Sequence, residues 1–196
     1  MARPQNRYIA LLRGINVGGH TIIKMADLRN LFESLGFTNV ASYIQTGNVL
    51  FSTKDTDSER LAQQLEKELE SLMGRRIRVF VLSPAELKKA AAHNPFEPEH
   101  AGEKHRCNLM FLSDAPEPER RKALMALQGE EYRFHIHGKL LYYTYSQEYV
   151  GKRRTIDFEK VLRVAGTVRT WKVIAKLIEM SEAKQDASKT KVSQAG

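Results

Sequence analysis

The residues best suited to chemistry follow the first apolar run of the chain. Residues 7–19 read R-Y-I-A-L-L-R-G-I-N-V-G-G, so an apolar segment gives way to Arg13, Asn16 and three glycines. Arginine and asparagine present planar hydrogen-bond donors, and glycine lets a ligand approach main-chain N–H groups closely. This pattern predicts a site for a phosphate, a carboxylate or a nucleotide. It matches neither the GxxxxGK[ST] phosphate loop nor the GxGxxG dinucleotide motif, and therefore indicates no reaction.

A second polar motif, Gln45-Thr46-Gly47-Asn48, separates the extended runs 40–44 and 49–52 as the turn of a hairpin does. In a ferredoxin-like sheet the first and third strands are antiparallel neighbours, so the end of the first strand meets the start of the third. The two motifs then form one donor-rich patch without a carboxylate. The first helix is expected to direct its N-terminal N–H groups into the same region.

Both motifs also have a purely structural interpretation. Gly47 and Asn48 could satisfy a tight turn, and Asn16 could hydrogen-bond a neighbouring loop. Arg13 could pair with a carboxylate such as Asp27. The sequence leaves these alternatives open.

Hydrophobic spacing predicts the elements that position the patch. The first part of the chain has the order β-α-β-β-α-β of a ferredoxin-like unit. Gly36 and Gly74 end its two helices. Its expected strands are residues 8–13, 40–44, 49–52 and 76–82.

The second part repeats this order without the final strand. A helix begins at Ser83-Pro84-Ala85-Glu86, a Pro-rich connection comes next, and β-α-β-β-α then leads to a last helix capped by Thr167. We therefore predict an α+β fold of two ferredoxin-like halves, the second lacking its last strand and followed by C-terminal helices. The expected segments are a first half over residues 1–82, a helix and connection over 83–104, a second half over 105–180 and a disordered tail over 181–196.

Composition limits the class of protein. The chain has 196 residues and a net charge of +8, and it contains no apolar run near the roughly 18 residues of a membrane span. The N-terminus lacks a signal-peptide pattern and the single Cys107 cannot form an internal disulfide, so we expect a soluble cytoplasmic protein without membrane contact. Residues 150–176 hold eight basic and two acidic residues. This excess favours a polyanionic partner or, alternatively, a solvated basic helix face.

Other chemistries have less support. The pairs His105/Cys107 and His135/His137 each lie on one strand face, but a third strand is expected between them and separates them by roughly 10 Å, too far for one metal ion. We therefore predict no metal site, and the sequence identifies no cofactor. Cys107 is expected to be buried and inert, and the tyrosines of residues 142–145 to pack rather than to stack on bases.

Three segments of the chain match a family pattern. They are R-G-I-N-V-G-G, the run K-M-A-D-L-R-N-L-F-E-S-L-G-F-T-N-V over residues 24–40, and Y-I-Q-T-G-N-V-L-F over residues 43–51. With them the chain resembles the bacterial family catalogued as domain of unknown function 1697. That family ends with a T-x-R-N-W-N-T-type motif, of which Thr167, Arg169 and Trp171 are present here. The family has no established activity, so the resemblance implies the fold, a cytoplasmic setting and the site at Arg13 and its neighbours.

Two functions of different classes are compatible with these features. One is binding of nucleic acid or a phosphorylated small molecule at the patch; the other is an enzyme whose anionic substrate lies in a cleft between the halves, although no base is evident. RNA-recognition sheets expose aromatic residues, whereas residues 9–12 are apolar on both faces, so another element is expected to cover the sheet. The candidate ligand-binding residues are Arg13, Asn16, Gly18, Gly19, Gln45, Thr46, Asn48 and Arg169.

Overall fold

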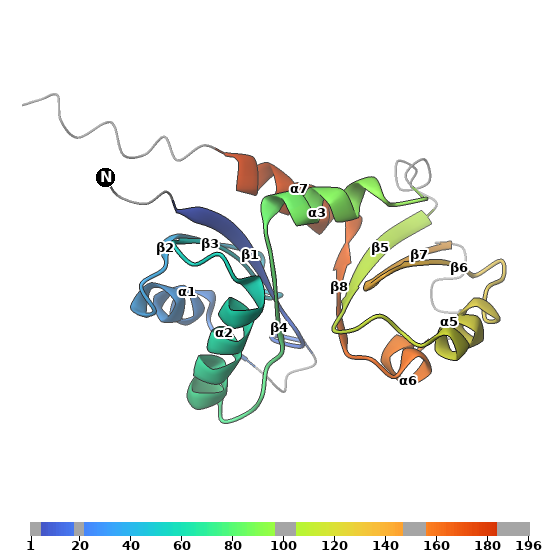
Figure 1. Ribbon diagram of the computed structural model, residues 1–196, viewed down its shortest axis with the longest axis horizontal. Coiled ribbons are helices and arrows are strands. Elements are labelled where there is room, and N and C mark those ends of the chain that lie inside the picture. The colour runs from blue at the N-terminus through green and yellow to red at the C-terminus, as the bar shows by residue number, and fades with distance from the viewer. Residues whose placement is uncertain (1–4, 18–21, 97–104, 147–155, 184–196) are drawn as a thin grey trace, which may run out of the picture.

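Two four-stranded antiparallel sheets form the framework of the protein and lie side by side in Figure 1. The structure is a computed structural model that describes residues 5–17, 22–96, 105–146 and 156–183. The first sheet has the strand order β2-β3-β1-β4 and the second has the order β6-β7-β5-β8. The two halves therefore share one topology, which confirms the expected pair of ferredoxin-like α+β units.

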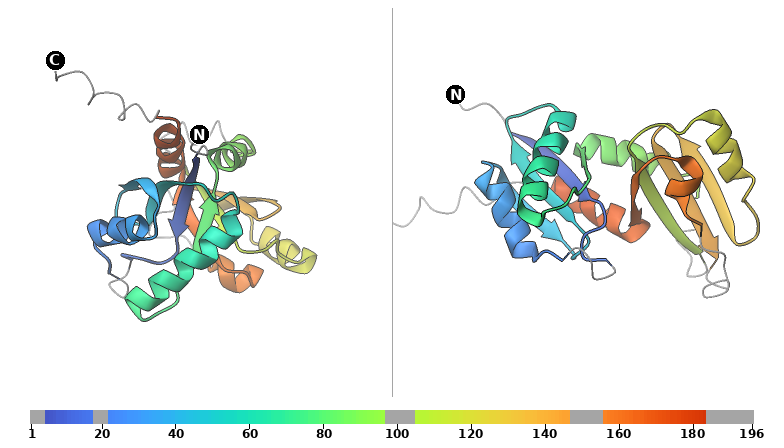
Figure 2. Two further views of the ribbon diagram at one scale, coloured as in Figure 1. Left: turned by 60° about the vertical axis from the view of Figure 1, so that its left-hand side comes forward. Right: turned by 90° about the horizontal axis from the view of Figure 1, so that it is seen from below.

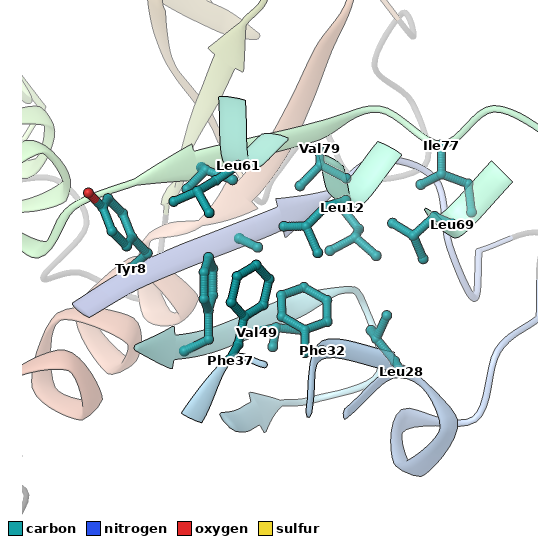
Figure 3. Close-up of a cluster of buried hydrophobic side chains, with 14 of the residues drawn as sticks. Tyr8, Leu12, Leu28, Phe32, Phe37, Val49, Leu61, Leu69, Ile77 and Val79 are labelled. Carbon is teal, nitrogen blue, oxygen red and sulfur yellow. The ribbon is translucent and has the colours of Figure 1, made fainter. Parts of the chain in front are cut away.

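The first half contains all the elements expected from its hydrophobic spacing. Its outer face is covered by α1 and α2, where Leu61, Leu65 and Leu69 recur every fourth residue and form one buried stripe. Figure 3 shows this core, with Tyr8 and Leu12 of β1 directed towards the helices. The elements of this half are β1 (Asn6–Leu12), α1 (Met25–Ser34), β2 (Thr38–Tyr43), β3 (Asn48–Thr53), α2 (Ser58–Met73) and β4 (Val79–Leu82).

The second half has the same layers. Its two helices cover one face of the sheet, where Phe134 and Tyr143 pack with Phe158 and Leu162. β7 lies between β5 and β6, so the strands that carry the two His pairs are separated as expected. The elements of this half are β5 (His105–Leu112), α5 (Pro118–Met125), β6 (Tyr132–His137), β7 (Leu140–Ser146), α6 (Phe158–Leu162) and β8 (Gly166–Thr170).

The expectation that the second half lacks its last strand is wrong. Gly166–Thr170 forms β8, which pairs antiparallel with β5. The expected helix ends early because Arg163 adopts a left-handed conformation with φ of 57° and serves as the C-cap of α6. Thr167 thus lies within a strand, and α7 (Trp171–Glu182) begins directly after it with Thr170 at the N-cap. A strand this short, joined to a helix without a turn, leaves little periodicity to detect.

Two helices, α3 (Pro84–Ala92) and α7, lie against each other between the halves, as Figures 1 and 2 show. Ser83 and Glu86 form the expected capping box of α3. Both helices pack on the inner faces of the two sheets, which confirms that another element covers residues 9–12. The shared core consists of Ile9, Leu11, Leu50, Leu87, Ala90, Phe96, Cys107, Leu109, Phe111, Tyr142, Val173, Ile174 and Leu177.

The shared core contains two side chains, Cys107 and Tyr142, for which the sequence predicted burial or packing. Cys107 is buried, as expected, and contacts the Asn94 carboxamide; burial raises the pKa of its thiol, which disfavours the reactive thiolate. The Tyr142 hydroxyl donates to the main-chain oxygen of Ala90 at 2.6 Å, and this tyrosine packs rather than offering a stacking surface. No helix among the described residues is long and apolar enough to cross a membrane.

Several expected features fall at or beyond the edges of the described residues. Residues 97–104 of the expected connection, the glycines Gly18 and Gly19, and residues 184–196 of the expected tail lie outside them. α7 extends to Glu182 and so includes the first two residues of that tail.

Candidate functional site

The end of β1 meets the turn before β3, as the topology predicted. Leu11 lies opposite Asn48, and the main-chain N–H of Leu12 donates to the Gly47 carbonyl at 2.8 Å. Gly47 has a φ of 77°, and a Cβ atom at this position would lie 2.8 Å from Cβ of Leu12 and 3.0 Å from the side chain of Ile15. Only glycine therefore fits, on grounds of both conformation and space.

Arg169 of β8 joins this turn to the second half. Its side chain is only 5% exposed, and burial lowers the pKa of Arg169 to about 10, so the guanidinium stays charged at neutral pH. It donates to six oxygen atoms, all of them neutral. These acceptors are the main-chain oxygens of Leu12 (2.9 Å), Thr46 (3.2 Å), Gly47 (3.2 Å) and Val168 (2.8 Å), Oγ1 of Thr167 (2.7 Å) and Oδ1 of Asn48.

Arg13 makes a second bridge between the halves. Its Nε donates to Oε1 of Glu159 at 2.8 Å, and a terminal nitrogen contacts Oε2, so the pair is bidentate. Oε1 also accepts the main-chain N–H of Gly166 at 2.7 Å. The hydrogen bond to Glu159 raises the pKa of Arg13. Arg13 thus has the carboxylate partner of the structural interpretation, but the partner is Glu159 rather than Asp27.

The two asparagines of the predicted patch use their carboxamides within the protein. Asn16, with φ of 53°, donates to the Ile23 and Gln45 carbonyls at 3.0 and 2.7 Å and accepts the Ile23 N–H at 2.9 Å. Asn48 is fully buried and donates to the Tyr43 carbonyl at 3.0 Å. Both side chains hold loops in place, as the structural interpretation described.

A cleft of about 380 Å³ lies where these segments meet. Arg13 and Thr46 line it from the first half, whereas Thr167, Arg169 and Thr170 line it from the second. α7 reaches the cleft with its N-terminus, through Thr170 and Val173. α1 begins beside Asn16, but none of the described lining residues belongs to it. The described lining residues include no His, Cys, Asp or Glu; they are Leu12, Arg13, Gly14, Ile15, Val17, Ile44, Thr46, Gly166, Thr167, Val168, Arg169, Thr170 and Val173.

A second cleft of about 330 Å³ lies between the halves at β4. Its walls come from β4 and α2 of the first half and from the end of β5 and the start of β7 in the second. Arg78 and Lys139 line it together with Glu59, Glu66 and Glu86, so charges of both signs are present.

Sequence reasoning assigned no site role to three residues at or beside the first cleft. Thr167 bonds Arg169 and Ile44 lies at the cleft wall, whereas Glu159 is not part of the lining and bonds Arg13. The signal for Thr167 was the alternation in the run G-T-V-R-T, which fits a strand as well as a helix cap. No local signal distinguishes Glu159, because its partner lies 146 positions away in the chain.

Comparison with known proteins adds a family and a fold. The model of the family described as protein of unknown function (DUF1697) matches residues 5–142. The chain belongs to this family. Among solved structures, a conserved bacterial protein from Streptococcus pneumoniae has the same fold, with a TM-score of 0.71, 23% identity, and coverage of 91% of this chain and 100% of that chain. No curated protein matches. The DUF1697 match includes Arg13 and Asn48, whereas Glu159 and Arg169 lie beyond its end.

Proposed function

We propose that this DUF1697 member binds a small anionic ligand, a carboxylate or a phosphorylated molecule such as a nucleotide, in the cleft lined by Arg13 and Arg169. The supporting observation is the environment of Arg169, a buried cation whose six contacts are all to neutral oxygens. A buried charge without an opposite charge is costly in a medium of low dielectric constant. An anion in the adjoining cleft would provide the missing negative charge.

The start of α7 also favours a negatively charged ligand. Thr170 makes no side-chain capping bond, and the first turn of α7 contains no acidic residue. The positive end of the α7 dipole thus lies at the cleft wall. Together with two arginines, this arrangement favours an anion over a neutral or cationic ligand.

The size and lining of the cleft favour a small molecule and binding without catalysis. A volume of about 380 Å³ is within the range of small-molecule sites. The inner sheet faces are covered by α3 and α7, so they offer no aromatic platform for nucleic-acid bases. An enzyme would use the same cleft, but its described lining contains no residue suited to act as a general base. A cytoplasmic setting stays a prediction.

Trp171, the single tryptophan of the chain and the first residue of α7, is a built-in reporter of binding. We expect its fluorescence to respond saturably to phosphate or acetate, with little difference between 50 and 300 mM NaCl. Arg13→Ala should weaken binding about tenfold or more, as loss of a charge-assisted hydrogen bond does, and Arg13→Lys should recover less than half of the loss. The matched control is Lys122→Ala, which removes an exposed charge on α5, away from the cleft.

Three results would count against the proposal. The first is the absence of a saturable response to either anion. The second is equal weakening by Lys122→Ala, which would make the effect one of net charge. The third is tight binding of a generic single-stranded oligonucleotide that falls steeply with salt, which would favour nucleic acid as the partner.

A further inference from the structure

Large apolar side chains are exposed at the wall of the arginine-lined cleft. Among the described residues, Val17 is 61% exposed and Ile44 is 46% exposed, and both line this cleft. Ile15, Val168 and Val173 also line this cleft. The cleft thus presents apolar side chains beside its two arginines.

Ile44 adopts a conformation that its residue type disfavours. Its φ is 48°, and of the four non-glycine residues with positive φ that the structure describes, it is the β-branched one. The others are Asn16, Asn39 and Arg163, and asparagine tolerates this region well. Because the Ile44 side chain is nearly half exposed, packing within the protein does little to offset the strain. Strained residues of this kind concentrate at ligand sites.

Asparagine or glycine at position 44 would relieve the strain and keep the turn. The needs of the turn therefore do not explain why an isoleucine is present at this position. Its side chain lies in the cleft wall with Val17. An apolar group of a bound ligand would cover both side chains.

We infer that the ligand is an amphipathic organic anion, with its carboxylate or phosphate near Arg13, Arg169 and the start of α7 and its aliphatic or aromatic group on Val17 and Ile44. This inference rests on the proposed function and adds the chemical class of the ligand. The head group supplies the negative charge that Arg169 lacks. The apolar group removes exposed hydrophobic surface from water, which explains why a strained isoleucine is kept in the turn.

Titration with homologous ligands tests this inference through Trp171 fluorescence or calorimetry. The probes are acetate, butyrate, hexanoate and phenylacetate, with methyl and butyl phosphate to distinguish the two head groups. Each added methylene should lower the Kd about threefold until the apolar wall is covered. A preference for the phosphate or the carboxylate series identifies the head group, and either preference supports the inference.

The variant Ile44→Asn separates binding from folding. It should leave the melting temperature unchanged or raise it, because asparagine accepts the left-handed conformation. It should abolish the gain in affinity with ligand chain length. The matched control Leu72→Gln removes an exposed leucine of α2, away from this cleft. It should preserve the increase in affinity with ligand chain length.

The outcomes distinguish this inference from the proposed function. Anion binding with no dependence on chain length would overturn the amphipathic ligand and leave the anion site standing. No binding of any probe would overturn both. If Ile44→Asn instead converts a dimer to a monomer in sedimentation, the apolar wall is an interface between copies and the inference is wrong.

Discussion

The two clefts between the halves are related by the internal repeat, yet only one of them has the character of an anion site. Each cleft is enclosed by the end of the first strand of one half and by the last strand of the other. Equivalent main-chain bonds confirm the relationship. Leu12 donates to Gly47 and Leu112 donates to Lys139, each at 2.8 Å, while Arg13 donates to Arg78 at 2.9 Å and Ser113 to Ala165 at 2.8 Å.

The side chains at equivalent positions differ sharply. Arg169 lies opposite Leu109 of β5, and its counterpart opposite Ile9 of β1 is Leu82. Arg13 likewise corresponds to Ser113. The backbone therefore provides two similar clefts, and a few substitutions give one of them a buried positive charge. The fold alone does not make the site.

The largest expected effect comes from replacing Arg169 of the first cleft with leucine, the residue type at the equivalent position of the second cleft. Among the described residues, Arg169→Leu removes the only donor to the Thr46 oxygen and to Oδ1 of Asn48. It also removes one of the donors to the Leu12 and Gly47 oxygens. We expect a loss of about 3 kcal/mol or more in the free energy of unfolding, measured by urea denaturation. Arg169→Lys should lose nearly as much, because an ammonium cannot reach acceptors on several sides. A loss below about 1 kcal/mol would mean that the guanidinium is not structural.

The glycines of the two hairpin turns provide the next test. Gly47 and Gly138 both have positive φ, at 77° and 57°, but a Cβ at Gly138 would meet no atom within 4 Å. Gly138→Ala should cost about 1 kcal/mol for conformation alone. Gly47→Ala should cost a further 1 to 3 kcal/mol or so because it also collides with Leu12. Equal melting temperatures for the two variants would show that the first turn is not tightly packed.

Glu159→Gln should increase anion affinity by about threefold to tenfold, equivalent to roughly 0.7 to 1.4 kcal/mol. The amide oxygen still accepts the Gly166 N–H, while the charge that holds Arg13 is removed. The increase should disappear in the double variant with Arg13→Ala. If it persists there, Glu159 repels the ligand directly and does not act through Arg13.

The smallest expected effect is that of Arg13→Ala on stability. The Arg13 and Glu159 side chains are 45% and 31% exposed, so water screens their ion pair and its loss should cost less than about 1 kcal/mol. Ser113→Ala, at the equivalent position, should change stability by less than about 0.5 kcal/mol. A large destabilisation by Arg13→Ala, with unchanged anion binding, would assign Arg13 a structural role only.

Local periodicity and strand topology were sufficient to predict the layers of the fold and the meeting of the end of the first strand with the turn before the third. Apolar residues on both faces of β1 indicated a covered sheet, and the ferredoxin-like order brought Arg13 to the turn at Gly47. The contacts between halves were not predictable in this way, because Arg169 reaches Asn48 across 121 positions and Arg13 reaches Glu159 across 146. Charge and residue type along the chain do not show which of many arginines is buried.

The bonds of Arg169 also constrain how the protein is made. The carbonyl groups of Thr46 and Gly47 are synthesised more than 120 residues before the side chain that binds them. The part of the inner sheet face that α7 covers likewise waits for that helix. On the ribosome, the first half can complete its outer core early and α3 can cover part of its inner face, but the turn and the rest of that face stay hydrated until β8 and α7 emerge. Truncated chains that end after α6 should therefore be retained by chaperones and degraded, because the first sheet keeps apolar surface that α7 would cover.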